Sequence, residues 1–399
     1  MTRQNVRVSE LVEAKTPRRE SRDGQLAEQI EKMFRRLRLA VVFGGNKAVD
    51  GAVIHQSTNA RSWKSYETVA NDLAKTMTRL GCRNVEIMPD DMRLGERLKA
   101  NESHLAWLNT GGVQGQCSVS HAPAMMEMFG IPYIGHDPMV AGILDNKHVF
   151  KRQLRAAGIP TADFFIWQPG LSNPDPIKDE GFFSSFGNFD GPFIVKPVSG
   201  RASLNVMYIE DRSGIQEAVK TVYDLTRNHV LIERYLSGKE YCVAIAGPII
   251  SRGGVLERLP TPFVFSALER SFDPGEKIFT SMDIKPITGE RARVLDPVKD
   301  EEAIVRLDLL ARRVFSELGV ETLVRLDVRA DAHGNMFILE ANPKPDLKAP
   351  EPGVTSLVSI GLPQFGMSYD DLIFSIFADR IDVLLSERRG TADRLLRLL

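Results

Sequence analysis

Hydrophobic residues in the first third of the chain form short runs, separated by stretches with helical spacing. Four runs predict buried strands, at residues 39–43, 85–88, 105–108 and 131–134. The segment 63–80 has apolar residues at helical intervals and predicts a helix between the first two strands. Strands that alternate with helices are typical of a parallel sheet. We therefore expect one α/β domain over residues 38–140.

The pattern changes after this domain. We expect Asp145 to cap a helix over residues 146–157 that ends at Gly158. Residues 169–190 are rich in Pro, Gly, Ser and Asn, which predicts a loop. The elements expected beyond the loop are strands at 193–196, 206–209, 230–232 and 241–245 and helices at 215–225 and 301–318. The second part of the chain is therefore expected to be α+β, with antiparallel strands.

Both ends of the chain depart from these patterns. Residues 1–23 are polar and lack apolar periodicity, so we expect a mobile arm there. Residues 26–37 have the spacing of a short amphipathic helix. From Ser386 onwards the chain is basic and helical in pattern, and we expect it to be peripheral.

Composition and charge narrow the class of protein. The 399 residues are 43% hydrophobic and carry a net charge of −1, so there is no basic field to favour a nucleic-acid partner. No apolar run approaches the ~20 residues that a membrane span needs. The three cysteines lack zinc-site spacing, and the N-terminus lacks the apolar segment of a signal peptide. We expect a cytoplasmic protein that binds neither nucleic acid nor membrane.

The strongest candidate for chemistry is a hairpin near the C-terminus. Arg325, Asp327 and Arg329 alternate with apolar residues and share one strand face, and Glu340 and Asn342 share a face on the next strand. Facing residues of paired strands lie ~5 Å apart, so two carboxylates and an amide oxygen are expected to converge. Such hard oxygen ligands suit Mg²⁺. The alternative is a solvated polar face on an edge hairpin.

A second candidate is Lys196, which ends an apolar strand and is followed by the small-residue loop 199–203. An ammonium group and backbone N–H groups in this arrangement can bind a polyphosphate. The alternative is an edge lysine that faces solvent. Lys147 and Lys151 are spaced i,i+4 on the predicted helix and point to one side, which a solvated helix face also explains.

A third candidate is the segment 230–241, where an apolar strand leads to Glu233 and Glu240 with Tyr235 and Leu236 between them. These residues could line a slot for adenine, with a carboxylate for the ribose hydroxyls. An ordinary strand and turn is the alternative.

The order of these segments along residues 39–385 resembles the ATP-grasp superfamily, in particular its D-alanine–D-alanine ligase branch. The motifs that carry the resemblance are Phe43-Gly-Gly45, Phe129-Gly-Ile-Pro-Tyr-Ile-Gly135, Asp145-Asn-Lys147, Gly158-Ile-Pro160, Ile194-Val-Lys-Pro197, Leu231–Glu240, Arg325-Leu-Asp327 and Leu339-Glu-Ala-Asn-Pro343. It implies an α/β ATP-grasp fold. The implied parts are an arm with a short helix (1–36), a parallel pre-ATP-grasp domain (37–145), two α+β subdomains that clasp ATP (146–245 and 246–385, the latter with the metal site) and a tail (386–399).

The resemblance also implies a role for each matching residue. ATP phosphates would contact Lys147, Lys196 and, in the phosphate loop, Ser203; adenine would contact Glu233 and the backbone of Arg234 and Leu236; ribose would contact Glu240. Arg325 would stabilise the transferring phosphoryl group, and Asp327, Glu340 and Asn342 would hold Mg²⁺. ATP and Mg²⁺ are thus the implied cofactors, and we also expect a homodimer.

The implied reaction activates a carboxylate as an acyl phosphate, which an amine attacks to give an amide, ADP and phosphate. Phosphoryl transfer mainly needs positioning and charge neutralisation. No protein nucleophile is required, and the sequence shows no convincing Ser/His or Cys/His arrangement.

Three departures from the family pattern concern the substrates. The family's Glu after the first Gly-Gly has no match in Asn46–Gly51, although Asp50 is a possible substitute, and the phosphate loop reads Gly200-Arg-Ala-Ser203. Asp346 replaces the glycine of the family's Pro-Gly-Met, between Lys344 and Lys348. These three residues imply a different acceptor. We therefore expect an amino-acid or peptide ligase, with a true D-alanine–D-alanine ligase second and an ATP-binding regulatory protein third.

Overall fold

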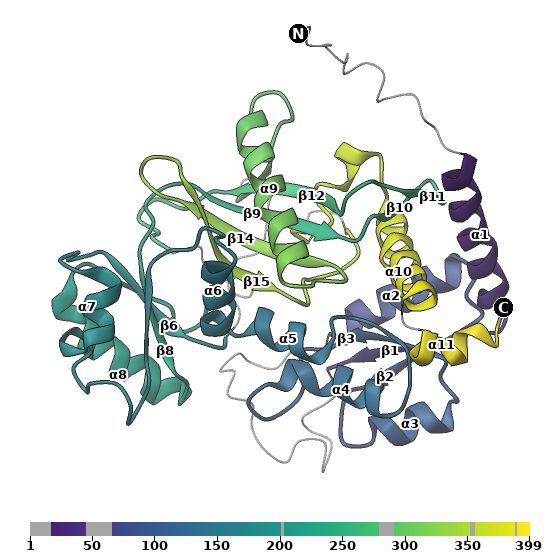
Figure 1. Cartoon of the computed structure of the whole chain (residues 1–399), viewed down its shortest axis with the longest axis horizontal. Helices are drawn as coiled ribbons and strands as arrows, with labels where there is room; N and C mark the ends of the chain where they lie inside the picture. Colours follow the sequence, from purple (N-terminus) through teal and green to yellow (C-terminus); the bar gives the residue numbers. More distant parts are fainter. Residues whose placement is uncertain (1–16, 45–65, 201–202, 279–290, 352–355, 388) are drawn as a thin grey trace, which may run out of the picture.

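The computed structural model describes residues 17–44, 66–200, 203–278, 291–351, 356–387 and 389–399, and the structural statements below refer to these ranges. Three larger sheets and one two-stranded sheet organise them (Figure 1). No helix within these ranges is both long and apolar enough to cross a bilayer.

The N-terminal sheet is parallel, as the alternation of strands and helices predicted. Its strands are β1 (Arg38–Phe43), β2 (Asn84–Pro89), β3 (Leu105–Asn109) and β4 (Tyr133–Ile134), in the order β2-β1-β3-β4. The helices that follow these strands are α2 (Glu67–Arg79), α3 (Leu94–Ala100), α4 (His121–Met128) and α5 (Pro138–Asp145). Val69, Leu73 and Met77 of α2 are buried at helical spacing and belong to the same core cluster as Leu39 and Val41 of β1.

A four-stranded antiparallel sheet with its helices forms one end of the molecule, at the left of Figure 1. Its order is β5 (Phe164–Trp167), β8 (Val230–Arg234), β6 (Phe193–Pro197) and β7 (Met207–Ile209), and its helices are α7 (Glu180–Phe186) and α8 (Ile215–Thr226). The prediction of a loop over 169–190 was wrong at α7. Asp179 caps this helix through Gly181 N, and Phe182 and Phe186 bury one face of it, which the polar composition around them hid.

The second antiparallel sheet has five strands, in the order β13 (Ala292–Val294), β12 (Phe263–Arg270), β9 (Glu240–Ala246), β14 (Val324–Ala330) and β15 (Met336–Asn342). Helix α9 (Glu301–Glu317) packs on it, and β10 (Ile249–Arg252) pairs with β11 (Val255–Arg258) beside it. Since β9 pairs with β12 and β14, the division between the two antiparallel sheets falls before Glu240 rather than at residue 245.

Helix α6 (Lys147–Ala156) contacts β15 and precedes the four-stranded sheet. The prediction that Asp145 caps it was wrong: Asp145 is the last residue of α5, and Asn146 is the cap. Asn146 Oδ1 accepts hydrogen bonds from the backbone N–H groups of His148 and Val149, both at 3.1 Å.

The two ends of the described chain lie side by side. Helix α1 (Pro17–Phe34) begins earlier than predicted, inside the expected arm, and lies beside α10 (Tyr369–Ser386) and α11 (Arg389–Leu396) (Figure 1). The C-terminal residues are not peripheral as expected. Ala392 and Leu395 of α11, and Leu398 just after it, are buried in the same core as residues of α1 and α10.

Candidate active site

A cavity of about 90 Å³ lies between the two antiparallel sheets. Its walls come from β6 and β8 on one side and from β9, β12, β14 and β15 on the other, with the N-terminus of α6 and the loop after β6. Seven of the predicted site residues line it: Lys147, Lys196, Ser203, Glu233, Glu240, Asp327 and Glu340. The fold thus brings together residues from four stretches of the sequence, at residues 147, 196–203, 233–240 and 327–340.

The β14–β15 hairpin that the sequence predicted is present, and its pairing brings the two polar faces together. Asp327 pairs with Glu340 and Arg325 pairs with Asn342, with an irregularity after Asp327. Arg325, Asp327 and Arg329 are 9%, 5% and 6% exposed. The alternative of a solvated polar face is therefore wrong for β14.

Arginine side chains surround the Asp327 carboxylate. Arg325 donates to it from Nε at 2.9 Å and from Nη2 at 3.1 Å, and Arg270 donates to both oxygens at 3.3 Å. Burial raises the pKa of Asp327, but the two guanidinium groups outweigh burial and hold this pKa below its usual value. Asp327 is therefore a carboxylate at neutral pH.

The other two predicted metal ligands are less enclosed. Glu340 lies 3.2 Å from Lys147 Nζ, and the buried Nδ2 of Asn342 has no hydrogen-bond partner within the described part of the chain. No group of three or more His, Cys, Asp or Glu residues suited to a metal occurs in the described ranges. The donor set of two carboxylates and one amide oxygen still fits Mg²⁺, which takes few protein ligands and keeps water and phosphate oxygens.

The lysines of the site are buried, and both solvent-facing alternatives are wrong. Lys196 lies on the inner strand β6 and is 5% exposed. Lys147 is 8% exposed and donates to the Gly200 carbonyl at 2.8 Å, and Lys151 is 0% exposed. The i,i+4 pair on α6 therefore marks the side of the helix that packs inwards.

Glu233 lies between two of these lysines. Lys196 Nζ donates a hydrogen bond to Glu233 Oε1, and Lys151 Nζ lies 3.0 Å from Oε2. Burial raises the pKa of Glu233, but the two ammonium groups outweigh it and bring this pKa to about 2. Glu233 is therefore ionised throughout the physiological range.

The structure separates Arg234 and Leu236 from the other predicted nucleotide contacts. These two residues line a second cavity, of about 600 Å³, whose walls also include Phe189, Tyr208 and Tyr235. The Arg234 guanidinium lies 4.2 Å from the centroid of the Phe189 ring and is exposed.

Glu240 binds two arginines to which the sequence analysis gave no role. Arg270 Nη1 donates to Glu240 Oε1 at 2.8 Å, and Arg329 Nη1 donates to Oε2 at 3.3 Å. Arg329 was recognised only as a neighbour on the Asp327 face, and Arg270 was missed. Strand β12 has an irregular register between Phe265 and Leu268, so simple alternation does not place Arg270 on the site face.

The remaining predicted residues lie at the edge of the site or outside it. Arg325 is not among the residues that line these cavities, and its guanidinium donates to Asp327. Lys344 lines a small cavity together with Lys147, Glu340 and Asn342. Its Nζ lies 3.2 Å from the centroid of the Tyr66 ring, at the start of α2.

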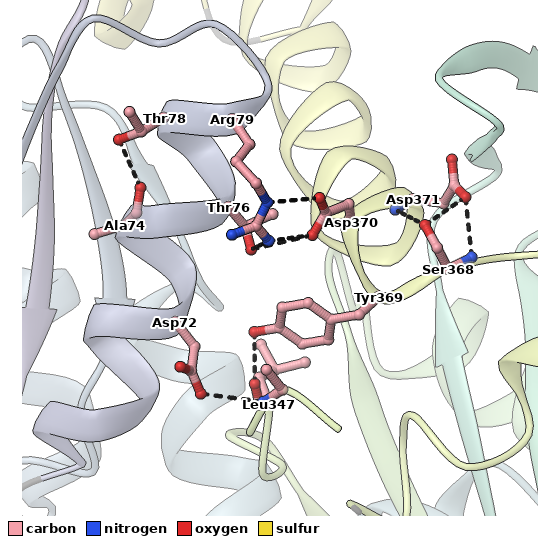
Figure 2. A network of polar contacts seen from close by, with 11 residues as sticks. Asp72, Ala74, Thr76, Thr78, Arg79, Leu347, Ser368, Tyr369, Asp370 and Asp371 are labelled. Atoms are coloured by element: carbon pink, nitrogen blue, oxygen red, sulfur yellow. Dashed lines mark hydrogen bonds and ion pairs between the residues drawn. The ribbon is translucent and has the colours of Figure 1, made fainter. Parts of the chain in front are cut away.

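The segment after β15 is held between α2 and α10 (Figure 2). Tyr369 Oη donates to the Leu347 carbonyl at 2.8 Å, and Asp72 accepts a hydrogen bond from Ala349 N at 3.1 Å. Asp346 Oδ1 accepts from Lys348 N at 3.1 Å, and the Lys348 side chain pairs with Glu351 at 2.9 Å. Asp346 and its neighbours thus lie where the N-terminal domain meets the β14–β15 hairpin.

Two sets of residues named in the sequence analysis lie outside the described residues. They are the segment Asn46–Gly51, with Asp50, and the loop positions Arg201 and Ala202.

Comparison with known proteins gives consistent matches. A family profile described as "D-ala D-ala ligase C-terminus" matches residues 153–378, more than half of the chain. The protein y4sG of Sinorhizobium fredii, itself uncharacterised, is 27% identical over 266 residues, which cover 66% of this chain and 71% of that protein. A D-alanine–D-alanine ligase of Synechococcus sp. (strain JA-2-3B'a(2-13)) is 24% identical over 306 residues, covering 76% of this chain and 84% of the ligase.

Solved structures confirm the expected α/β ATP-grasp fold. The ATP complex of D-alanine–D-alanine ligase from Bacillus anthracis aligns with a TM-score of 0.61 at 20% identity, covering 88% of this chain and 99% of the ligase. VanG D-Ala:D-Ser ligase from Enterococcus faecalis aligns with a TM-score of 0.59 at 15% identity, covering 86% of this chain and 99% of that chain. At these identities the likeness establishes the fold.

Proposed function

Because the chain belongs to the D-alanine–D-alanine ligase family of ATP-grasp, ADP-forming ligases, we propose that it joins an amino acid or small peptide to an amine. Members of this family use ATP with Mg²⁺. The observation that carries the proposal is the convergence of Lys147, Lys196, Asp327 and Glu340 on one cavity between two sheets. Such a set of cations and metal-binding oxygens suits a triphosphate.

The proposed reaction has two steps. An oxygen of the carboxylate substrate attacks the γ-phosphorus of ATP, the bond to ADP breaks, and an acyl phosphate forms. The amine then attacks the acyl carbon, phosphate leaves, and the nitrogen loses a proton. Both steps need positioning and charge neutralisation rather than a protein nucleophile.

We assign the phosphate contacts to Lys147, Lys196 and Ser203. Asp327, Glu340 and Asn342 would hold Mg²⁺, which supplies charge neutralisation for the phosphates when it is bound. Arg325 lies beside Asp327 and would stabilise the transferring phosphoryl group. Its Nε and Nη2 donate to that carboxylate, whereas its Nη1 takes no part in this contact and would be the group that faces the phosphoryl oxygens.

For the nucleoside, we propose that Glu240 contacts the ribose and that Glu233, with the backbone of Arg234 and Leu236, contacts adenine. The structure supports the placement of Glu233 and Glu240 on the cavity wall. Arg234 and Leu236 line the neighbouring cavity. Contact with adenine would therefore have to come from their backbone N–H and C=O groups rather than from their side chains.

For the acceptor, we propose that Asp346, with Lys344 and Lys348, favours an amine other than D-alanine. Asp346 occupies the position of a family glycine on a segment that begins directly after the proposed metal ligand Asn342. A carboxylate there would repel an acyl phosphate unless a cation compensates. A cationic acceptor, or one of the two lysines, would supply that charge. Acceptors other than D-alanine are compatible with this fold, since the structurally similar VanG protein is a D-Ala:D-Ser ligase.

A second candidate is a true D-alanine–D-alanine ligase, which the names of the relatives favour. Release of ADP from ATP–Mg²⁺ in the presence of paired panels of D- and L-amino acids separates the two. We expect ADP only when a carboxylate and an amine are both present, and little product with D-alanine alone. Efficient D-alanyl-D-alanine synthesis would establish the second candidate. Nucleotide binding without ADP release from any pair would instead favour a regulatory protein.

A further inference from the structure

Lys151 is a buried lysine that has no part in the roles proposed above. It lies on α6, its side chain is 0% exposed, and it is absent from the walls of the cavities described here. Its Nζ lies 3.0 Å from Glu233 Oε2 and donates to Thr161 Oγ1 at 2.6 Å. Thr161 in turn donates to the Ile338 carbonyl of β15 at 2.8 Å. Lys151 is thus fixed by both antiparallel sheets.

The Glu233 carboxylate therefore has two counter-ions, and they differ in access. Lys196 lines the cavity, whereas Lys151 does not. An anionic ligand in the cavity can attract only Lys196 away from Glu233. A buried carboxylate that loses its partner is strongly destabilised, so a site with Lys196 alone would resist that transfer.

We propose that Lys151 is a positioning residue that stays with Glu233 when Lys196 moves to the nucleotide phosphates, so that Lys196 can bind the ligand without leaving a bare buried carboxylate. The inference depends on the proposed function, because it takes ATP as the ligand. Lys151 itself lies outside the cavity wall and would touch no substrate. Its effect passes through Glu233.

The electrostatics of the cluster agree with this division. Burial lowers the pKa of Lys151, whereas for Lys196 the neighbouring Glu233 and Glu340 outweigh burial and raise the pKa. The charged groups that face Glu233 are Lys151 from α6 and Lys196 from β6. Glu340 of β15 acts on Lys196 and is itself paired with Lys147.

The test is calorimetric titration of the full chain with ATP–Mg²⁺, which needs no turnover. Lys151→Met is expected to raise the Kd for ATP on the order of 100-fold, because ATP binding then leaves the buried Glu233 carboxylate without a counter-ion. In a Glu233→Gln background no carboxylate needs a counter-ion. There, Lys151→Met is expected to change the Kd less than about threefold.

The pH dependence supplies a second readout. With Lys151→Met, ATP binding is expected to strengthen about tenfold or more from about pH 8.5 to about pH 6, because a stranded buried carboxylate has a raised pKa and becomes protonated. The wild-type chain keeps Glu233 paired and ionised, and its Kd should change much less over this range.

Two matched variants distinguish the loss of the charge beside Glu233 from a general disturbance of α6 and its contacts. Arg152→Met removes an exposed cation from the same helix, and Thr161→Val removes the hydrogen bonds of Thr161 to Lys151 and to Ile338 but leaves the Lys151–Glu233 ion pair. Both should bind ATP with near wild-type affinity and pH dependence.

The outcomes distinguish this inference from the proposed function. A wild-type chain that binds no ATP would defeat the proposed function itself. A wild-type chain that binds ATP, with Lys151→Met binding as tightly, would overturn the role of Lys151 alone. Equal losses from Lys151→Met in the wild-type and Glu233→Gln backgrounds, without a change in pH dependence, would show a merely structural lysine. If Lys151→Met alone does not fold, the comparison within the Glu233→Gln background decides between these readings.

Discussion

At the scale of single residues, the site is defined by which charges face each other in a buried space. Asp327 and Glu340 lie opposite one another, and Lys147 joins Glu340 to the loop at Gly200. Each carboxylate already has a cationic partner in the described structure. In the proposed roles Mg²⁺ and phosphate would share these groups with their present partners or displace them, and substitutions can test each contact.

Glu340→Gln tests the metal assignment. The amide keeps the shape of the side chain but removes one of the two proposed carboxylate ligands, so we expect turnover to fall about 1,000-fold or more with little change in Tm. ADP release at saturating Mg²⁺ and thermal unfolding measure the two quantities. Normal ADP release from this variant would remove Glu340 from the metal site.

Lys196→Ala tests the phosphate contact. Because Lys151 remains with Glu233, we expect the variant to fold and its KM for ATP to rise about 10- to 100-fold, with a much smaller change for the carboxylate substrate. Steady-state kinetics with each substrate varied in turn give both values. Unchanged kinetics for ATP would show that Lys196 is only a partner of Glu233.

At the scale of elements, the segment after β15 connects the β14–β15 hairpin to the N-terminal domain. Figure 2 shows its Leu347 carbonyl bound by Tyr369 of α10, and nearby Arg79 of α2 bound to Asp370 at 2.6 Å. The Arg79–Asp370 pair is partly exposed and contributes little by itself. The tyrosine hydrogen bond is the more important constraint on the segment, since it is half-buried and fixes the backbone next to Asp346.

Asp346→Asn tests whether this segment selects the acceptor. Removal of the charge should raise the KM for a cationic acceptor amine about tenfold and leave the KM for ATP unchanged. Kinetics with the acceptor found by the ADP-release panel measure the effect. Asp346→Gly restores the family residue and serves as the comparison; D-alanyl-D-alanine synthesis that is robust in the wild type and indifferent to this change would refute the assignment.

Tyr369→Phe tests the positioning of the same segment. Loss of the hydrogen bond to the Leu347 carbonyl should cost about 1 kcal/mol of stability and raise the KM for the acceptor about threefold, without an effect on ATP. Chemical denaturation and acceptor kinetics provide the measurements. A change in the KM for ATP alone would mean that the segment positions the nucleotide rather than the acceptor.

At the scale of the whole molecule, the C-terminal helix α10 joins the N-terminal sheet to the β10–β11 hairpin. Asp379 of α10 is 5% exposed and accepts a hydrogen bond from Ile249 N at 3.2 Å. Burial raises the pKa of Asp379 to about 7. The folded chain therefore holds a proton there that the unfolded chain releases at a lower pH.

This proton predicts how stability depends on pH. Because the folded pKa lies above the unfolded one, the stabilisation is complete below about pH 4 and is lost as the pH rises towards about 7. Asp379→Asn keeps an acceptor for Ile249 N and cannot ionise, so its Tm should exceed that of the wild type most at pH above about 7. Thermal unfolding across this range tests the prediction; equal Tm differences at every pH would contradict it.

Local sequence determined which side chains share a face on each strand of the β14–β15 hairpin. The alternation of charged and apolar residues over 324–342 places Arg325 and Asp327 on one face of their strand and Glu340 and Asn342 on one face of theirs, because strand geometry has a period of two residues. The helical spacing of Lys147 and Lys151 likewise fixed that they share one side of α6. Periodicity within one element carries this information.

Only the tertiary structure decided what covers those faces. Periodicity shows that two lysines share a side but not that Glu233, far along the chain from Lys151, pairs with one of them in the interior. Arg270 reaches Glu240 and Asp327 through an irregular register in β12, and Arg234 and Leu236 turn towards a different cavity from Glu233. Burial and ion pairing arise between elements distant in sequence, so the counter-ions of this site follow from how the two sheets meet.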